Sequence, residues 1–159
     1  MKKETAMKNF RYNRFLILRY LLAAFFFSNL YWLLMLWMSR SWYGLLPASL
    51  LLLTLPAIAE HAKLYGDITD QIQGKLRHHK FYQSIQLGMN LVLLVISFTS
   101  GGFQRLYPFL TVSSQARAAL VTILLVGIFL SAFCLQRIRR IYLQKDRHYG
   151  YIKEFAKTN

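Results

Sequence analysis

Acidic residues and cysteine are scarce in this chain. Its 159 residues include six aspartates and glutamates and one cysteine, Cys134. A single cysteine excludes a disulfide within the chain. Six carboxylates leave little material for a site that holds a metal ion or a diphosphate through several acidic groups. The sequence also has no Walker loop, no Gly-x-Ser-x-Gly motif and no zincin histidine pair, so it predicts no catalytic residue, metal site or cofactor.

Charge is also missing from four long apolar stretches, which hold charged residues only at their edges. They span residues 20–38, 43–60, 84–100 and 117–135. A membrane core about 30 Å thick requires roughly 20 apolar residues in a helix, with about 17 as the short limit. Four such stretches leave too little polar surface for a soluble domain of this length. The predicted fold class is therefore an all-α integral membrane protein, a single domain over residues 1–159 with four transmembrane helices in an antiparallel bundle.

The basic residues are distributed unevenly around these stretches. Of the 20 lysines and arginines, 17 lie in the head (1–19), the middle loop (61–83) and the tail (136–159). Lysine and arginine are retained in the cytoplasm during insertion, so these three segments and both termini are predicted to be cytoplasmic. The net charge of +14 would suggest nucleic acid in a soluble protein. In a membrane protein we expect the bases to fix the topology and to contact anionic lipids, and no nucleic-acid partner is predicted.

The predicted cytoplasmic segments carry amphipathic patterns. In the middle loop, Leu64, Ile68, Ile72 and Leu76 recur every four residues, which predicts a short helix with one apolar stripe on the membrane surface. The tail continues the fourth stretch with isoleucines interleaved with bases, as in interfacial helices. We expect these bases to contact anionic lipid or, alternatively, an acidic partner. The tail bases are Arg137, Arg139, Arg140, Lys145 and Arg147.

The second outer loop, residues 101–116, is itself apolar. Gly101 and Gly102 are predicted to end the third helix, because glycine adopts the left-handed conformation that closes many helices. We expect the rest of the loop to lie in the headgroup layer, or else to serve as a landing site for a partner. Trp32 and Trp37 are expected in the aromatic belt at the same boundary.

Glu60 is the only carboxylate that adjoins a predicted span, and Pro56 lies four residues before it. Proline loosens a helix, and a carboxylate at a loosened helix in a membrane can hold a proton or a cation. Glu60 is therefore a candidate ion or proton site together with Asn90 and Gln86. Its place at the cytoplasmic end of the span favours the alternative that it pairs with a base or water at the headgroup level.

Three amides lie in the predicted spans, with Asn29 in the first and Gln86 and Asn90 on one face of the third. Buried amides in a membrane usually link helices through hydrogen bonds, and this interpretation is favoured over a polar path. Gly127 and Ser131 form a small-xxx-small pair, which lets two helices approach closely. Asn29, Gly127 and Ser131 are therefore predicted to pack helices together, within the fold or against another protein.

Histidines and aspartates gather in the middle loop and raise the question of a metal site. His78 and His79 are adjacent, with His61 in the same loop. Neighbouring residues on a helix point about 100° apart and cannot easily share one ion, so solvated or lipid-facing histidines are the favoured interpretation. Asp67 and Asp70 have the spacing of a magnesium–diphosphate site but lack a third carboxylate nearby.

Three hypotheses for function follow from these features. The favoured one is a non-catalytic accessory or scaffold subunit of a larger membrane complex, because the chain is small and its cytoplasmic pieces are basic and amphipathic. The second is a small oligomeric transporter or channel that uses Glu60 and Asn90. The third is a membrane enzyme acting on lipid through Asp67, Asp70 and one of the adjacent histidines. Expected partners are anionic lipids and another membrane protein or a second copy, and the short loops without a glycosylation sequon fit a bacterial plasma membrane.

Overall fold

Every element that the structure describes is a helix. The structure is a computed structural model, and it describes residues 2–66, 74–145 and 150. The elements, in chain order, are α1 (Lys2–Met38), the short 3-10 helix η1 (Trp42–Gly44), α2 (Leu45–Gly66), α3 (Arg77–Ser97), α4 (Ser100–Leu106) and α5 (Ser114–Tyr142). The all-α prediction is therefore confirmed for the described residues.

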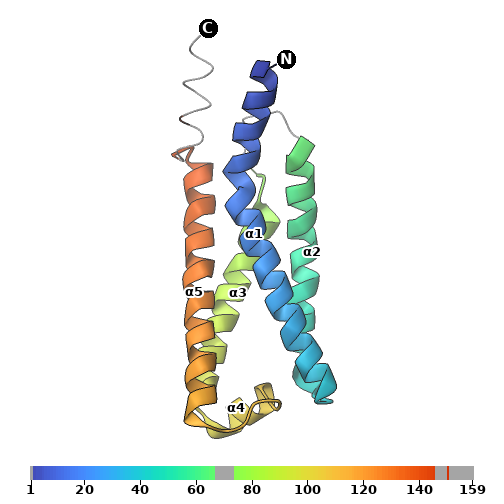
Figure 1. Cartoon of the computed structure of the whole chain (residues 1–159), viewed down its shortest axis with the longest axis vertical. Helices are drawn as coiled ribbons and strands as arrows, with labels where there is room; N and C mark the ends of the chain where they lie inside the picture. The colour runs from blue at the N-terminus through green and yellow to red at the C-terminus, as the bar shows by residue number, and fades with distance from the viewer. Residues whose placement is uncertain (1, 67–73, 146–149, 151–159) are drawn as a thin grey trace.

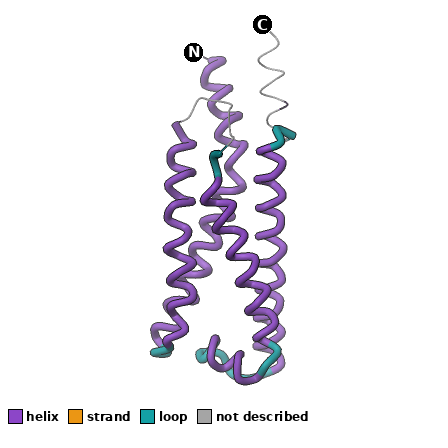
Figure 2. Tube along the Cα trace, turned by 180° about the vertical axis from the view of Figure 1, so that it is seen from behind, coloured by secondary structure: helices purple, strands orange, loops and turns teal. Residues whose placement is uncertain are grey.

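The four long helices run along the long axis of the molecule (Figure 1). α4 crosses the end of the bundle at which α1 ends and α5 begins, whereas the start of α1 and the end of α5 lie at the opposite end (Figure 1, Figure 2). α1 and α2 form a hairpin through η1, and α3 packs chiefly against α5. α1 meets α5 where Phe15 and Leu18 share one buried cluster with Ile138 and Ile141.

Three segments are long and apolar enough to cross a membrane. They are Tyr12–Met38 in α1, Trp42–Leu64 in η1 and α2, and Ser114–Tyr142 in α5. These segments contain three of the four predicted spans, which supports a location in a membrane. The remaining predicted span, residues 84–100, lies largely in α3. α3 is not among the three candidate segments, and it contains a larger share of polar residues than they do.

Most of the buried side chains of α3 are polar, whereas its exposed side chains include several large apolar ones. The buried residues recur every three or four positions, which places them on one face of the helix. The opposite face exposes large apolar side chains, among them Phe81, Leu91, Val92 and Val95. A helix on the surface of a soluble protein has the reverse arrangement. The exposed face of α3 is therefore suited to lipid.

The end of α3 differs from its prediction. α3 ends at Ser97, and Gly101 and Gly102 lie in the first turn of α4. Neither glycine has the positive φ of a left-handed cap, so that prediction was wrong. Thr99 caps α4 by accepting a hydrogen bond from the backbone N–H of Gly102. Glycine is needed at position 102 for a steric reason, because a Cβ there would collide with the side chain of Ile96.

Several apolar side chains of the second outer loop pack onto the bundle, and the location of the loop in the headgroup layer stays a prediction. Phe103, Leu106 and Tyr107 are buried against α3 and α5. Trp32 of α1 stacks on Tyr107 with ring centroids 5.8 Å apart, and its Nε1 donates to the carbonyl oxygen of Leu106 at 3.3 Å. Trp32 therefore anchors this segment, and its place in an aromatic belt stays a prediction. α4 and the residues after it close one end of the bundle.

The middle loop, predicted at residues 61–83, is shorter in the structure. α2 continues to Gly66 and α3 begins at Arg77, so both ends of the predicted loop are helical. Ile68 and Ile72 of the apolar stripe lie outside the described residues. The predicted amphipathic helix therefore stays a prediction.

The head and the first part of the tail are helical. α1 begins at Lys2, and α5 continues to Tyr142. Ile138 and Ile141 are buried in one cluster with Leu76, which precedes α3. These isoleucines pack inward, so this part of the tail belongs to the bundle, and its location at the membrane surface stays a prediction.

Candidate functional site

The candidate site is a buried polar ladder along the inner face of α3. Its members are His79, Tyr82, Gln83, Gln86 and Asn90. Tyr82 and Gln83 are adjacent and the other spacings are three or four residues, so all five side chains lie on one broad face of the helix. Buried polar groups cost free energy unless they are hydrogen-bonded. For the polar ladder, the partners come from α1, α2 and α5.

Asn29 of α1 meets the middle of the polar ladder. Its Nδ2 donates to the Tyr82 hydroxyl oxygen at 3.2 Å and to Gln86 Oε1 at 2.9 Å. The Tyr82 hydroxyl donates to Gln86 Oε1 at 3.0 Å, and Gln86 Nε2 donates to Asn90 Oδ1 at 3.1 Å. The four bonds form one network between α1 and α3. This geometry supports the interpretation of the amides as links between helices.

α5 meets the polar ladder through its small residues. Gln83 Nε2 donates to Ser131 Oγ at 2.9 Å. Gly127 lies against Asn90, where a Cβ at position 127 would stand 2.7 Å from Asn90 Nδ2. The small-xxx-small pair therefore faces α3 within the fold, a placement that the sequence left open.

Two histidines and the cysteine join α2, α3 and α5. His61 Nε2 and His79 Nδ1 are 2.7 Å apart, and His79 Nε2 lies 3.6 Å from Cys134 Sγ. His61 is 5 % exposed and His79 is fully buried, so the prediction of solvated or lipid-facing histidines was wrong for this pair. The physical reason is that α2 and α3 extend past the predicted spans and pack there. His78, the neighbour of His79, is exposed as predicted.

The surroundings of His79 set its protonation state. His79 lies outside the three candidate membrane-spanning segments. Burial, and next the proximity of His61, lower the pKa of His79 from its ordinary value of 6.5 to about 3. The imidazole is therefore neutral at pH 7, with one ring nitrogen as a donor and the other as an acceptor.

Glu60 caps α3 from the neighbouring helix. Its Oε1 accepts a hydrogen bond from the backbone N–H of His78, and its Oε2 accepts one from that of His79, both at 3.0 Å. The first N–H groups of a helix have no partner within it and carry the positive end of the helix dipole. The N-cap residue of α3, Leu76, makes no side-chain cap bond. Glu60 therefore supplies the cap that the local sequence lacks.

The three residues of the candidate ion site are not brought together. Gln86 and Asn90 bond to each other, whereas Glu60 bonds at His78, eight residues away along α3. At 1.5 Å per residue this is a separation of about 12 Å. Pro56 lies inside α2, which continues through it to Gly66.

Arg14 has a buried charged side chain, although the sequence placed it in the predicted cytoplasmic head. It is 2 % exposed, and its Nη2 donates to the carbonyl oxygen of Ile141 at 3.4 Å. This bond ties α1 to the end of α5. A signal was present, because Phe15, Leu18 and Leu22 continue the helical spacing of the first span toward the N-terminus.

The tail bases lie in different environments. Arg139, Arg140 and Lys145 are exposed at the end of α5, whereas Arg137 is half-buried. Arg147 lies outside the described residues. Contact of these bases with anionic lipid or an acidic partner stays a prediction.

The described residues, 2–66, 74–145 and 150, include histidines, acidic residues and Cys134, all of which can bind metal ions. In these ranges no group of three His, Cys, Asp or Glu side chains is placed to hold a metal ion. Asp67 and Asp70, the residues of the diphosphate hypothesis, lie outside them. No protein-family model, curated protein or solved structure matches the chain. Its function is therefore inferred from the contacts and grooves of the described helices.

Proposed function

We propose that this chain is a non-catalytic accessory or scaffold subunit of a larger membrane complex. The observation that carries the proposal is how its buried polar groups are used. The amides of the polar ladder bond to one another, to Asn29 and to Ser131, and Glu60 caps α3. Polar side chains engaged in this way hold helices together and leave few groups for a transport path or a reaction.

A groove beside the polar ladder offers a place for the partner. It has a volume of about 500 Å³ and is lined by residues of α1, α3, α5 and the segment after α4. Its lining includes the small side chains of Ser28, Ala119 and Gly127 and the amide of Asn90. Small residues and amides are typical of helix–helix interfaces in membranes. The occupant that we propose is a transmembrane helix of a second protein.

Copurification tests this proposal. We expect the tagged full chain, purified in mild detergent from the membrane in which it is made, to retain a stoichiometric protein partner. Ala119→Leu adds bulk at an exposed position in the groove. The variant should bind the partner at least about tenfold more weakly, a loss of about 1.4 kcal/mol of binding free energy. Val92→Leu, on the lipid-suited face of α3, should leave the partner in place.

Two results would contradict the proposal. A wild-type chain that purifies alone, or only with copies of itself, would remove the accessory role. A partner that both variants retain equally would show that the groove is not its docking site, and a lipid would then be the occupant to seek.

We further propose that the predicted span over residues 84–100, most of which lies in α3, is a fourth crossing of a plasma membrane, and that both termini are cytoplasmic. The apolar outer face of α3 supports the additional span. The start of α1 and the end of α5 lie at the same end of the bundle (Figure 1). Exposed bases at that end, including Arg139, Arg140 and Lys145, support its cytoplasmic location.

Cysteine labelling checks this orientation. Cys134 is buried, so the wild-type chain should react little and provides the background. In intact cells a membrane-impermeant maleimide should label Trp42→Cys, a position that is 88 % exposed at the outer hairpin. Lys145→Cys, at the basic end, should react only after permeabilisation. The opposite pattern would place the basic end outside the cell.

A small oligomeric transporter or channel is the alternative proposal. It rests on the buried amides and on Glu60. Glu60 caps α3 at His78, eight residues before Gln86, which is about 12 Å along the helix axis. Flux into proteoliposomes distinguishes the two proposals. An accessory subunit carries no flux on its own, whereas a transporter carries a flux that Glu60→Gln or Asn90→Leu reduces.

A further inference from the structure

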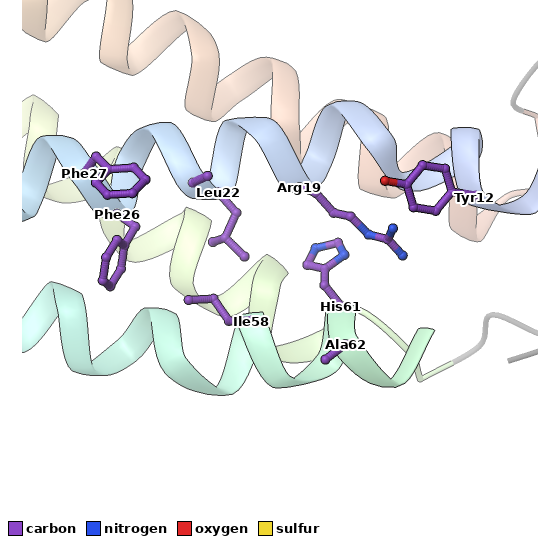
Figure 3. A pocket seen from close by; sticks show the side chains of 9 residues that line it. Tyr12, Arg19, Leu22, Phe26, Phe27, Ile58, His61 and Ala62 are labelled. Atoms are coloured by element: carbon purple, nitrogen blue, oxygen red, sulfur yellow. The ribbon is translucent and has the colours of Figure 1, made fainter. Parts of the chain in front are cut away.

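A second groove, distinct from the one beside the polar ladder, lies between α1 and α2 and has a volume of about 660 Å³. Figure 3 shows that its polar and apolar side chains are separated along its length. Arg19 of α1 and His61 of α2 lie toward the end nearer the start of α1, where their side chains approach each other. Leu22, Phe26 and Ile58 line the other part. The groove therefore has one cationic end and one apolar end.

The positive charge is held in a defined position. The guanidinium carbon of Arg19 lies 4.8 Å from the centroid of the Tyr12 ring, a cation–π contact. Tyr12 precedes Arg19 by seven residues, so both side chains lie on the same face of α1. Arginine near the end of a membrane helix commonly directs its head toward the interface while its stem stays in apolar surroundings. Lipid phosphates lie at that interface, so an arginine held in this way is suited to contact one.

His61 adds a buried nitrogen that has no hydrogen-bond partner in the described part of the chain. This atom is Nδ1, whereas Nε2 faces His79 Nδ1 at 2.7 Å. On its other side, His79 Nε2 lies 3.6 Å from the Cys134 thiol. When the thiol donates to His79 Nε2, His79 donates through Nδ1 to His61 Nε2, and His61 Nδ1 carries a hydrogen. A buried N–H without an acceptor raises the free energy of the folded chain. An acceptor from outside the chain would therefore satisfy the last donor of this hydrogen-bonded row.

We propose that this groove binds an anionic glycerophospholipid from the adjoining leaflet. The phosphate lies at Arg19 and His61, and an acyl chain lies along Leu22, Phe26 and Ile58. A guanidinium forms strong charge-assisted hydrogen bonds with phosphate oxygens, and in the tautomer in which the Cys134 thiol donates, His61 Nδ1–H adds a neutral donor. Between Arg19 and Phe26 the helix rises about 10 Å, so the acyl chain can contact apolar side chains over that length. The net charge of +14 favours an anionic lipid over a zwitterionic one.

Native mass spectrometry of the full chain in mild detergent tests the proposal, with dioleoyl phosphatidylglycerol and dioleoyl phosphatidylcholine as probes. We expect one phosphatidylglycerol to bind per chain, at least about tenfold more tightly than phosphatidylcholine. Arg19→Gln should weaken the binding of phosphatidylglycerol at least about tenfold. Arg140→Gln removes an exposed arginine of α5 and should change nothing. Equal binding of the two lipids, or equal loss in the two variants, would mean diffuse attraction to a basic surface and would overturn the proposal.

Ala23→Phe tests the groove without altering its charge. Ala23 lines the groove and is exposed, so a larger side chain can fill the space without entering the core. The variant should lose the bound lipid while its thermal unfolding in lipid-free detergent stays unchanged, and it decides the matter even if Arg19→Gln fails to fold. Retention of the lipid would overturn the placement. So would release of a copurified protein with no change in bound lipid, because the occupant would then be that protein.

Discussion

Tyr82→Ala is expected to lower the free energy of unfolding by about 3–5 kcal/mol, the range for large aromatic side chains removed from a packed core. Tyr82 is completely buried in one cluster with Leu22 and Phe25 of α1 and Ala57 of α2. Its hydroxyl also accepts from Asn29. Alanine would leave a cavity between three helices that can only partly refill it. Unfolding by sodium dodecyl sulfate in mixed micelles, followed by circular dichroism, measures the loss.

Phe81 offers the matched control because it is the next residue and lies on the opposite face of α3. It is 58 % exposed, so lipid or detergent replaces its contacts and Phe81→Ala should cost less than about 1 kcal/mol. Tyr82→Phe isolates the hydroxyl, which should contribute about 0.6 kcal/mol, as hydrogen bonds in membrane proteins do on average. Equal losses for Phe81→Ala and Tyr82→Ala would mean that α3 does not face the bundle as described.

The sequence predicted the positions of the apolar helices better than their ends. A membrane demands long apolar runs, and these runs located the central parts of α1, α2 and α5. The helices continue past these runs into the charged flanking segments, whose cytoplasmic location stays a prediction. Arg14 and Ile138 illustrate this, since both are buried where helices continue beyond the apolar runs and pack against each other. Charge counting identifies which side a segment faces but does not detect such packing.

α4 was missed for a related reason. The apolar residues of the second outer loop have the same composition whether they lie in a headgroup layer or cover the end of a bundle. Burial of Phe103 and Tyr107 depends on Trp32, which lies far away in the sequence. Local pattern cannot supply that contact, because it exists only once α1 and α4 are neighbours.

The candidate site shows the same division between local and tertiary signals. The shared face of Gln86 and Asn90 follows from their spacing of four residues, and the structure shows them bonded to each other. The His61–His79 contact and the Glu60 cap were not predicted, because they join α2 to α3. A sequence displays the carboxylate and the imidazoles but not the helix ends that bring them together.

Acidification from pH 7.5 to pH 5 is expected to destabilise the bundle by about 2 kcal/mol through His79 alone. Burial lowers the pKa of His79 to about 3 in the folded chain, against 6.5 for an ordinary histidine. Below pH 6.5 the unfolded chain takes up a proton that the folded chain does not. The stabilisation from neutral His79 is therefore fully present above pH 6.5 and is lost, at up to about 1.4 kcal/mol per pH unit, as the pH falls toward 3.

The adjacent histidines separate this effect from a general effect of acid. His79→Gln keeps a side chain that can form hydrogen bonds but does not titrate, so it should reduce the fall in unfolding free energy between pH 7.5 and pH 5 by about 2 kcal/mol. His78→Gln changes an exposed residue and should leave the slope as it is in the wild type. The range stops at pH 5 because ordinary carboxylates, with pKa values of about 4, remain ionised there. A wild-type chain equally stable at both pH values, or equal flattening by the two variants, would show that His79 is not buried as a neutral imidazole between His61 and Cys134.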